Sequence, residues 1–396
     1  MEMPAISCHG LPVRSCRIYD SLDPSSAHHL VHTTLQEPAV FGSMIEHWQY
    51  RNMWTPQRLS EVFGDKRTKF RIIPRMVNES SGVVWETQCQ YVDASFIDFQ
   101  RWIKGDQRFE ETDDCGVIIS SSKCSRMDDG FQFDAPKLGD FNPVVHAAYA
   151  DYKYIRDLFL EIPVYKEAVD WSPFGHPEMT GEHSTFWLGS SGAHTPCHYD
   201  TYGFNLVAQL YGKKRWTLFP PDQSACLYPT RLPYEESSVF SRVNIKQPDL
   251  ETYPWFANAE PVEVVLEPGH VLFVPKHWWH FVESLNTSIS VNMWVNVESD
   301  CLDRVQEAIA RNVVMSMRTP NEAARPEDWM VSPDQHASSE ENLSLLNAAL
   351  TDLAHNLQPH TEQRIDITND DLINILAHPD VVRLASQKLL EQAGII

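Results

Sequence analysis

Residues 194–200 read HTPCHYD and residues 277–283 read HWWHFVE, and these two stretches decide the fold and chemistry expected of the chain. On a β-strand, residues i and i+2 project from the same face, so His198 and Asp200 can both reach one metal ion. His280 supplies a second imidazole. Two histidines and one carboxylate form the ligand set of non-haem iron oxygenases and leave coordination positions open. We therefore predict His198, Asp200 and His280 as metal ligands, with no catalytic residue beyond them.

The sequence alone also allows other interpretations of these residues. A His-x-Asp pair is common by chance, and His280 is also readable as a hydrogen-bonded core histidine. His277 is a competing ligand. We prefer His280 because it directly precedes an apolar strand, which gives it a rigid mount. Trp278 and Trp279 would wall a dry pocket beside it.

Short apolar runs separated by turn residues extend from both stretches. They predict strands at 185–188, 204–210, 216–219, 262–266, 271–274, 281–284 and 288–295. Gly212, the Pro220-Pro221 pair and Pro268-Gly269 lie between them as turns. Many short strands with regular turns are typical of a sandwich or barrel, so the fold class is mainly β.

The flanking segments carry helical patterns. Thr55-Pro56 begins a helix that Gly64 ends, and residues 91–103 are expected to form a second amphipathic helix. Thr368 caps a helix near the end of the chain. The predicted organisation is an N-terminal helix and strand region that packs on the core, then the core, a helix, a linker and a C-terminal helical segment. Their bounds are 1–145, 146–300, 301–318, 319–341 and 342–396, with an irregular loop at 104–144.

A dicarboxylate co-substrate would need a cation and a hydroxyl near the metal. Lys214 begins a strand that we expect beside the metal-binding strands, in a meander, and Thr195 supplies a hydroxyl. Asn205 and Asn292 lie within apolar strands, where a buried amide must be hydrogen-bonded. They would orient a bound carboxylate or bond to the sheet backbone. The basic run 213–215 is equally readable as a solvated turn.

Composition limits the classes of function. The chain has 396 residues and a net charge of −22, which argues against general nucleic-acid binding. Its 8 cysteines form no C-x-x-C pair, and no run of apolar residues is long enough to predict a membrane span. We expect a reducing compartment with free thiols, and hence a cytoplasmic and also nuclear location.

The motifs together resemble the JmjC family of Fe(II)- and 2-oxoglutarate-dependent oxygenases. The resemblance rests on residues 195–200, 205–221, 227–229 and 268–294. It implies a double-stranded β-helix, a cupin-like jelly roll with flanking α-helices. It also implies that Fe(II) is bound by the predicted triad and that Lys214, Thr195, Asn205 and Asn292 hold 2-oxoglutarate. The family uses a further upstream tyrosine for this co-substrate. We assign it to Tyr152, with Tyr149 and Tyr154 as alternatives.

Residues 192–198, 227–231 and 233–241 resemble the branch of the family that is associated with a small heat-shock protein. This resemblance implies hydroxylation of a protein substrate and a small heat-shock protein as a partner. The alternatives are a chaperone-associated interaction protein with weak or no catalysis and a tRNA hydroxylase. A homodimer through the C-terminal helices is a further expectation. The sequence does not identify the substrate.

Overall fold

The computed structural model describes residues 5–6, 11–48, 50–75, 82–105, 135–317, 330–331, 337–358 and 365–392. The chain divides into two compact units. Unit 1 comprises residues 1–199, 204–229 and 240–295, and unit 2 comprises residues 200–203, 230–239 and 296–396. Most of the predicted loop at 104–144 and most of the predicted linker at 319–341 lie outside the described residues.

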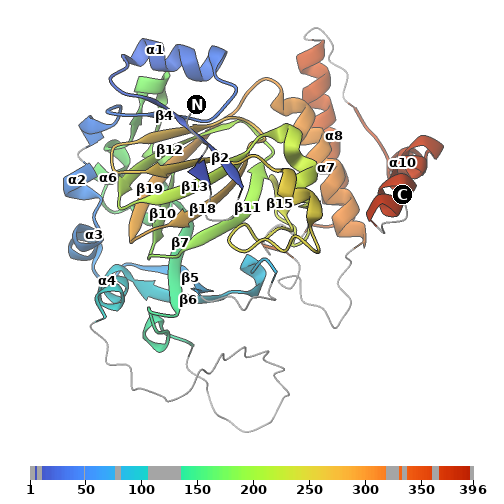
Figure 1. Ribbon diagram of the computed structural model, residues 1–396. Helices are drawn as coiled ribbons and strands as arrows, with labels where there is room; N and C mark the ends of the chain where they lie inside the picture. The colour runs from blue at the N-terminus through green and yellow to red at the C-terminus, as the bar shows by residue number, and fades with distance from the viewer. Residues whose placement is uncertain are drawn as a thin grey trace, which may run out of the picture. The chain divides into compact units, whose positions relative to one another are not determined.

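Two large β-sheets dominate unit 1 (Figure 1). The first sheet has the order β1-β2-β16-β13-β18-β11-β15-β14. Its strands are β1 (Ala5–Ile6), β2 (Pro12–Ser15), β11 (His194–Asp200), β13 (Lys214–Phe219), β14 (Pro229–Thr230), β15 (Ser238–Ser241), β16 (Val262–Leu266) and β18 (Trp279–Ser284).

The second sheet has the order β3-β4-β17-β12-β19-β10-β7-β5-β6. Its strands are β3 (Arg17–Tyr19), β4 (Ala39–Phe41), β5 (Arg67–Pro74), β6 (Gln90–Ser95), β7 (His146–Tyr154), β10 (Thr185–Gly189), β12 (Phe204–Tyr211), β17 (Val271–Val274) and β19 (Ser288–Val295). A separate pair consists of β8 (Asp170–Trp171) and β9 (His176–Thr180).

Successive strands of the core alternate between the two sheets. Strands β10 to β13 do so, and strands β16 to β19 do so again. This alternation with antiparallel neighbours is a jelly roll, so the predicted fold class is confirmed. The predicted meander around Lys214 is wrong, because β13 lies between β16 and β18, which both come later in the chain. The interior is packed with side chains from both sheets, including Val207, Trp216 and Leu272.

The N-terminal region contributes strands to the second sheet as well as packing helices. Strand β4 pairs with β17, and β5 pairs with β7. The predicted helix at 91–103 is wrong in its first part, because Gln90–Ser95 is strand β6 and pairs with β5. The helix begins only at Phe96, where the Ser95 hydroxyl accepts a hydrogen bond from the backbone N–H of Asp98. Pairing with β5, a contact distant in sequence, outweighs the local helical pattern.

Capping side chains mark the start of some of the helices of unit 1. As predicted, Thr55 caps α3 through a hydrogen bond from the Arg58 backbone N–H, 3.1 Å long, and Gly64 ends the helix. The α-helices are α1 (Pro24–His29), α2 (Tyr50–Met53), α3 (Pro56–Phe63), α4 (Phe96–Lys104), α5 (Ile155–Leu158) and α6 (Val164–Glu167). A π-helical turn, η1 (Leu30–Thr34), follows α1. The 3₁₀ turns are η2 (Glu46–Trp48), η3 (Glu86–Gln88), η4 (Leu138–Asp140), η5 (Ser172–Phe174), η6 (Gly181–His183), η7 (Pro221–Leu227) and η8 (Pro254–Asn258).

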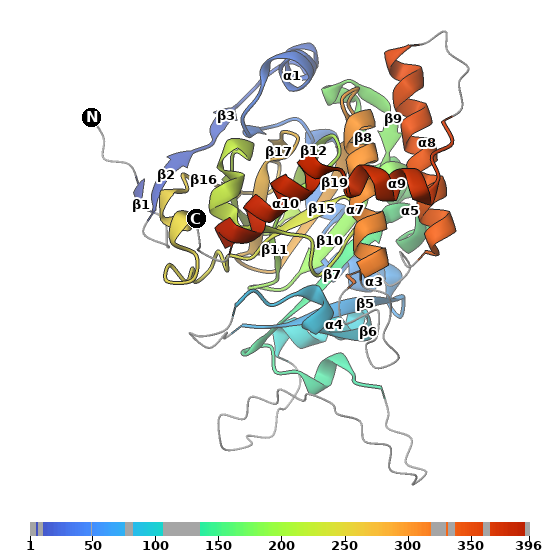
Figure 2. The same ribbon diagram turned by 90° about the vertical axis from the view of Figure 1, so that its right-hand side faces the viewer.

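Unit 2 is mainly helical. It contains α7 (Asp300–Met317), α8 (Ser339–Leu357), α9 (Asn369–Leu376) and α10 (Pro379–Gln392). Figure 2 shows α7 and α8 side by side with α9 close to both, and Val305, Leu346 and Leu372 form their common core. Helix α8 begins at Ser339, ahead of the predicted Asn342, because Ser338 caps it. None of the described helices combines the length and apolar character needed to span a membrane.

Candidate metal centre

Three predicted ligands converge at the ends of two neighbouring strands. His198 and Asp200 lie on β11, and His280 lies on β18. One potential ligand atom from each residue lies within 4.8 Å of the others. Both histidines are buried, with 5% and 4% of their surface exposed, whereas Asp200 is half-buried. Two imidazoles and one carboxylate at this spacing fit a divalent transition metal, Fe(II) in particular.

Strand pairing brings the two histidines together. β11 and β18 are antiparallel, and His198 is the register partner of His280. The register shifts between Thr195 and His198, which marks a bulge in β11. Bulges re-aim side chains next to functional sites, and this one is directly before the first ligand.

Backbone carbonyls fix the tautomer of both rings. His198 Nδ1 lies 2.9 Å from the carbonyl oxygen of Pro196, and His280 Nδ1 lies 2.9 Å from that of Trp278. A carbonyl oxygen only accepts, so each Nδ1 carries the proton and each lone pair is on Nε2. Hydrogen bonds of this kind, from a ring nitrogen to a backbone carbonyl, orient metal-binding histidines. Both rings are therefore preorganised to ligate through Nε2.

His277, the competing ligand, lies apart from this cluster. Its backbone has a φ of 63°, and its ring packs 5.4 Å from that of Tyr199. The group of ligand atoms around His198 includes His280 and not His277. The structure thus places His280, the histidine that the sequence favoured, beside His198 and Asp200.

Lys214 is a buried cation inside the jelly roll. Only 2% of its surface is exposed, and its Nζ donates to the Ser290 hydroxyl at 2.7 Å and to the Tyr149 hydroxyl at 3.3 Å. Strand β13 belongs to the first sheet, whereas β7 and β19 belong to the second, so Lys214 reaches between the sheets. Burial lowers the pKa of its ammonium group to about 7.

The tyrosine beside Lys214 is Tyr149. Its hydroxyl is also hydrogen-bonded to the Thr195 side chain, so three polar groups meet at this point. Tyr152, the sequence-predicted residue, instead packs its ring 4.5 Å from that of Trp187. The sequence did carry a signal for Tyr149, because it lies among the buried alanines of β7, whereas Tyr152 lies near the strand's more exposed end.

Asn205 and Asn292 are joined in a buried chain of hydrogen bonds. The Asn292 amide donates to Asn205 Oδ1 at 2.9 Å, and the Trp187 indole donates to Asn292 Oδ1 at 2.7 Å. Ser290 and Asn292 are two residues apart on β19 and project from the same face. Asn292 thus shares a strand face with a hydrogen-bond partner of Lys214, and Asn205 is joined to Asn292 from the neighbouring strand β12.

A buried ion network near Lys214 was not visible in the sequence. Arg71 is 1% exposed, with Nη1 2.9 Å from Glu86 Oε1 and Nε 2.8 Å from Asp151 Oδ2. Asp151 favours the charged form of Lys214, although burial has the larger effect on the pKa of that lysine. Arg71 also donates to the backbone carbonyl of His194 at 3.1 Å, which ties the network to β11.

The donor set and the buried lysine fit the groups that the sequence implies. Within the described part of the chain, no carboxylate forms an ion pair with Lys214. A buried ammonium group without a counter-charge is costly, and an anionic ligand would remove that cost. The triad fits Fe(II), and Lys214 with Tyr149 and Thr195 fits one carboxylate of 2-oxoglutarate.

Comparison with known proteins supports this architecture. The profile of the Cupin-like domain family matches residues 26–301. HSPB1-associated protein 1 of Rattus norvegicus is 42% identical over 324 residues, which cover 80% of this chain and 61% of the rat protein. The Homo sapiens protein of that name is 38% identical over 368 residues, covering 90% of this chain and 69% of the human protein.

A more distant relative carries the name of the domain. Jumonji C domain-containing protein 5 of Drosophila melanogaster is 34% identical over 148 residues, 36% of each chain. The chain spans about three fifths of the length of the rat and mouse relatives.

Proposed function

Because the chain belongs to the cupin-like JmjC family, we propose that it is an Fe(II)- and 2-oxoglutarate-dependent oxygenase that hydroxylates a protein substrate. The observation that carries the proposal is the convergence of His198, Asp200 and His280 on one point. When bound there, Fe(II) with 2-oxoglutarate and O₂ would supply the oxidation of a C–H bond to C–OH, with succinate and CO₂ as the other products.

The residues of the chain have separate tasks in this proposal. His198, Asp200 and His280 would hold the iron, and the carbonyls of Pro196 and Trp278 keep the two imidazoles in the ligating tautomer. The burial of both rings excludes bulk water from this side of the site.

Lys214, Tyr149 and Thr195 would bind the distal carboxylate of 2-oxoglutarate. Lys214 would supply the charge and the two hydroxyls would supply directional hydrogen bonds. Asn205 and Asn292 would line the space between this group and the metal. Their mutual hydrogen bond fixes the orientation of both amides.

The activity is tested by following 2-oxoglutarate and a captured substrate together. The wild-type protein with Fe(II), 2-oxoglutarate and O₂ should form succinate, and a bound protein substrate should gain the mass of one oxygen atom. His198→Ala should abolish both signals. Succinate formation that is unchanged in the folded His198→Ala protein would refute the assignment.

A second candidate function is binding of a small heat-shock protein. The relatives named HSPB1-associated protein 1 suggest it, and helix α10 supports it because Leu384 and Leu389 are 56% and 67% exposed. The double variant Leu384→Asp/Leu389→Asp should lose binding to a purified small heat-shock protein in a pull-down. Leu357→Asp, on the exposed side of α8, is the control. Equal binding by wild type and double variant would exclude α10 as the contact.

A further inference from the structure

A cavity of about 260 Å³ lies in unit 1 on the opposite face of β11 and β18 from the metal ligands. Phe281 lines it, and Phe281 directly follows the metal-site residue His280 on β18. Neighbouring residues of a strand point to opposite faces, and the bulge in β11 leaves His194 as the register partner of Glu283, on the same side as Phe281. The cavity and the metal site are therefore on different sides of this sheet. The site is therefore distinct from the one proposed for 2-oxoglutarate.

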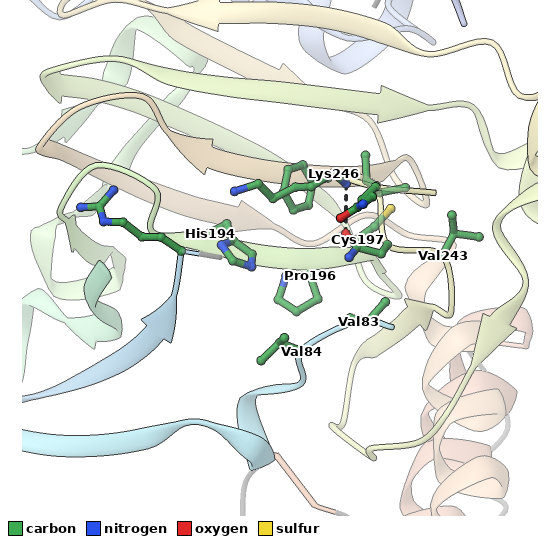
Figure 3. Close-up of a pocket in the computed structure, with 12 residues that line it drawn as sticks. Val83, Val84, His194, Pro196, Cys197, Val243 and Lys246 are labelled. Atoms are coloured by element: carbon green, nitrogen blue, oxygen red, sulfur yellow. Dashed lines mark hydrogen bonds between the residues drawn. The ribbon is translucent and has the colours of Figure 1, made fainter. Parts of the chain in front are cut away.

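Three segments of the chain build the walls. Figure 3 shows His194, Pro196 and Cys197 along β11, Val83 and Val84 on a separate segment, and Val243 and Lys246 on a loop. Valine, proline and phenylalanine side chains make much of this lining apolar. A ligand with an apolar body would be stabilised by leaving water here.

The charged residues that line the cavity, taken with their ion-pair partner, carry one net positive charge. Arg75 and Lys246 line it, and Glu283 pairs with Lys246 through a contact of 2.7 Å between Oε1 and Nζ. Burial lowers the pKa of Arg75, and Glu283 only partly offsets this effect. A single anionic group beside Arg75 would offset the rest of the cost of burying its positive charge.

The Arg75 side chain is held in place through its Nε. Its Nε donates to the carbonyls of Pro143 and His146 at 3.0 and 2.8 Å. Over the described residues these are the hydrogen bonds of its side chain, so Nη1 and Nη2 remain available. A guanidinium group presents paired donors that match a carboxylate.

His194 gives the cavity a neutral polar wall. Its Nδ1 lies 3.0 Å from the carbonyl oxygen of Gly192, so this nitrogen carries the proton. Burial lowers the pKa of His194 to about 4, so the ring is uncharged at neutral pH. The unprotonated Nε2 would accept a hydrogen bond and would not neutralise an anion.

The loop wall is preorganised by its own hydrogen bonds. Asn244 Oδ1 accepts from the Lys246 backbone N–H at 3.1 Å, the dashed line in Figure 3. The Val243 backbone N–H donates to the Ser241 hydroxyl at 3.1 Å. Asn244 also donates to the Gly82 carbonyl at 3.5 Å and so links the loop to the Val83–Val84 segment. A site that is already ordered loses less entropy when a ligand binds.

We propose that this cavity binds a small monocarboxylate with a branched apolar body. One net positive charge matches one carboxylate, and Arg75 provides the paired donors. The valine and phenylalanine walls match a branched hydrocarbon, whereas a phosphate dianion would be desolvated against them without a second unpaired cation.

The probe is 4-methylpentanoate, with its neutral amide 4-methylpentanamide and inorganic phosphate as comparison ligands. Isothermal titration calorimetry on the full chain, with the metal and 2-oxoglutarate present, should show binding of the carboxylate. The amide should bind at least about tenfold more weakly, and phosphate should give no saturable signal. Absence of carboxylate binding, or equal binding of the amide, would overturn the proposal.

Variants locate the binding in this cavity. Lys246→Met leaves Glu283 to offset Arg75, so carboxylate affinity should fall by at least about tenfold. Lys213→Met removes the same charge outside the cavity, where Lys213 pairs with Glu267 at 2.6 Å, and should bind as wild type does. Val84→Phe fills a half-buried part of the wall and should also abolish binding, with thermal unfolding as the check on folding. Equal affinity in folded Lys246→Met and Lys213→Met proteins would contradict the site.

Discussion

His198 and His280 are register partners on β11 and β18, and their ring centroids lie 4.2 Å apart. Each ring is held by the carbonyl of the residue two positions before it, Pro196 for His198 and Trp278 for His280. Two strands that are distant in sequence, β11 and β18, thus hold their histidine rings by the same kind of hydrogen bond. This relationship places two equivalent nitrogen ligands beside Asp200 without any rearrangement of the sheet.

Lys214 should dominate the affinity for 2-oxoglutarate. Lys214→Met removes the buried charge that would pair with the distal carboxylate, so affinity should fall by about 100-fold or more, as for truncation of one partner of a buried charge pair. Lys213→Met, one residue away and half-exposed, should leave affinity unchanged. Calorimetric titration with 2-oxoglutarate measures both, and a similar loss in the two variants would speak against the assignment.

Binding of 2-oxoglutarate should take up a proton in a pH-dependent way. Lys214 has a pKa of about 7 in the protein, below the ordinary 10.5, so most of it is neutral at pH 8.5. A bound carboxylate favours the ammonium form, and binding should then take up about one proton at pH 8.5 and almost none at pH 6. Calorimetry in buffers of different ionisation enthalpy gives this number. Equal uptake at both pH values would contradict the role.

The same shift has a consequence for the stability of the free protein. Between pH 7 and 10.5 the unfolded chain holds the Lys214 proton more strongly than the folded chain does. The contribution of Lys214 to the free energy of unfolding should therefore rise with pH across this window. Denaturant unfolding of wild type and Lys214→Met at pH 7 and pH 10 tests this, because the rise should be smaller in the variant.

Tyr149 and Tyr152 should differ as co-substrate ligands. Tyr149→Phe removes a hydroxyl that contacts Lys214 and Thr195, and the affinity for 2-oxoglutarate should fall by about tenfold, as expected for a hydrogen bond to a charged group. Tyr152→Phe keeps the ring against Trp187 and should change affinity little. Competition binding with succinate as the displaced ligand compares the two, and a larger loss in Tyr152→Phe would favour Tyr152 over Tyr149 as the ligand.

Arg71 should be essential for folding stability. Arg71→Met leaves the Glu86 and Asp151 carboxylates buried without their cation, so we expect a loss of about 3–5 kcal/mol in the free energy of unfolding. Arg67, on the same strand, pairs with Asp93 while 53% exposed, and Arg67→Met should cost less than about 1 kcal/mol. Chemical denaturation compares the two variants. Comparable losses of unfolding free energy in the two variants would show that the buried ion pairs of Arg71 contribute no more to stability than the exposed pair of Arg67.

Local patterns predicted much of this fold because they coincide with the final contacts. The run 204–210 and the run 288–295 became the paired strands β12 and β19 because their apolar residues face a shared core. The first part of the predicted helix at 91–103 was wrong for the opposite reason. Its first residues pair with β5, and no local pattern reports a partner that distant in sequence.

The metal ligands were predictable, whereas the surroundings of Lys214 were only partly so. The i and i+2 spacing of His198 and Asp200 is local, and one strand sets it. Tyr149, Ser290 and the Arg71 network meet Lys214 through three-dimensional packing between the sheets. The sequence pointed to a tyrosine on this strand, and the alanines around Tyr149 were a signal for that residue. Its contact with Lys214, which distinguishes it from Tyr152, comes from packing between the sheets.

Fe(II) binding distinguishes His280 from His277 as the second histidine ligand of the metal. Anaerobic calorimetric titration with Fe(II) should show one ion bound per wild-type chain. Removal of a metal ligand should cost more affinity than loss of a group that only orients a ligand, so His280→Ala should weaken Fe(II) binding by more than about 100-fold. His277→Ala should bind as wild type does. Tight binding retained by His280→Ala, or lost in His277→Ala instead, would contradict the account.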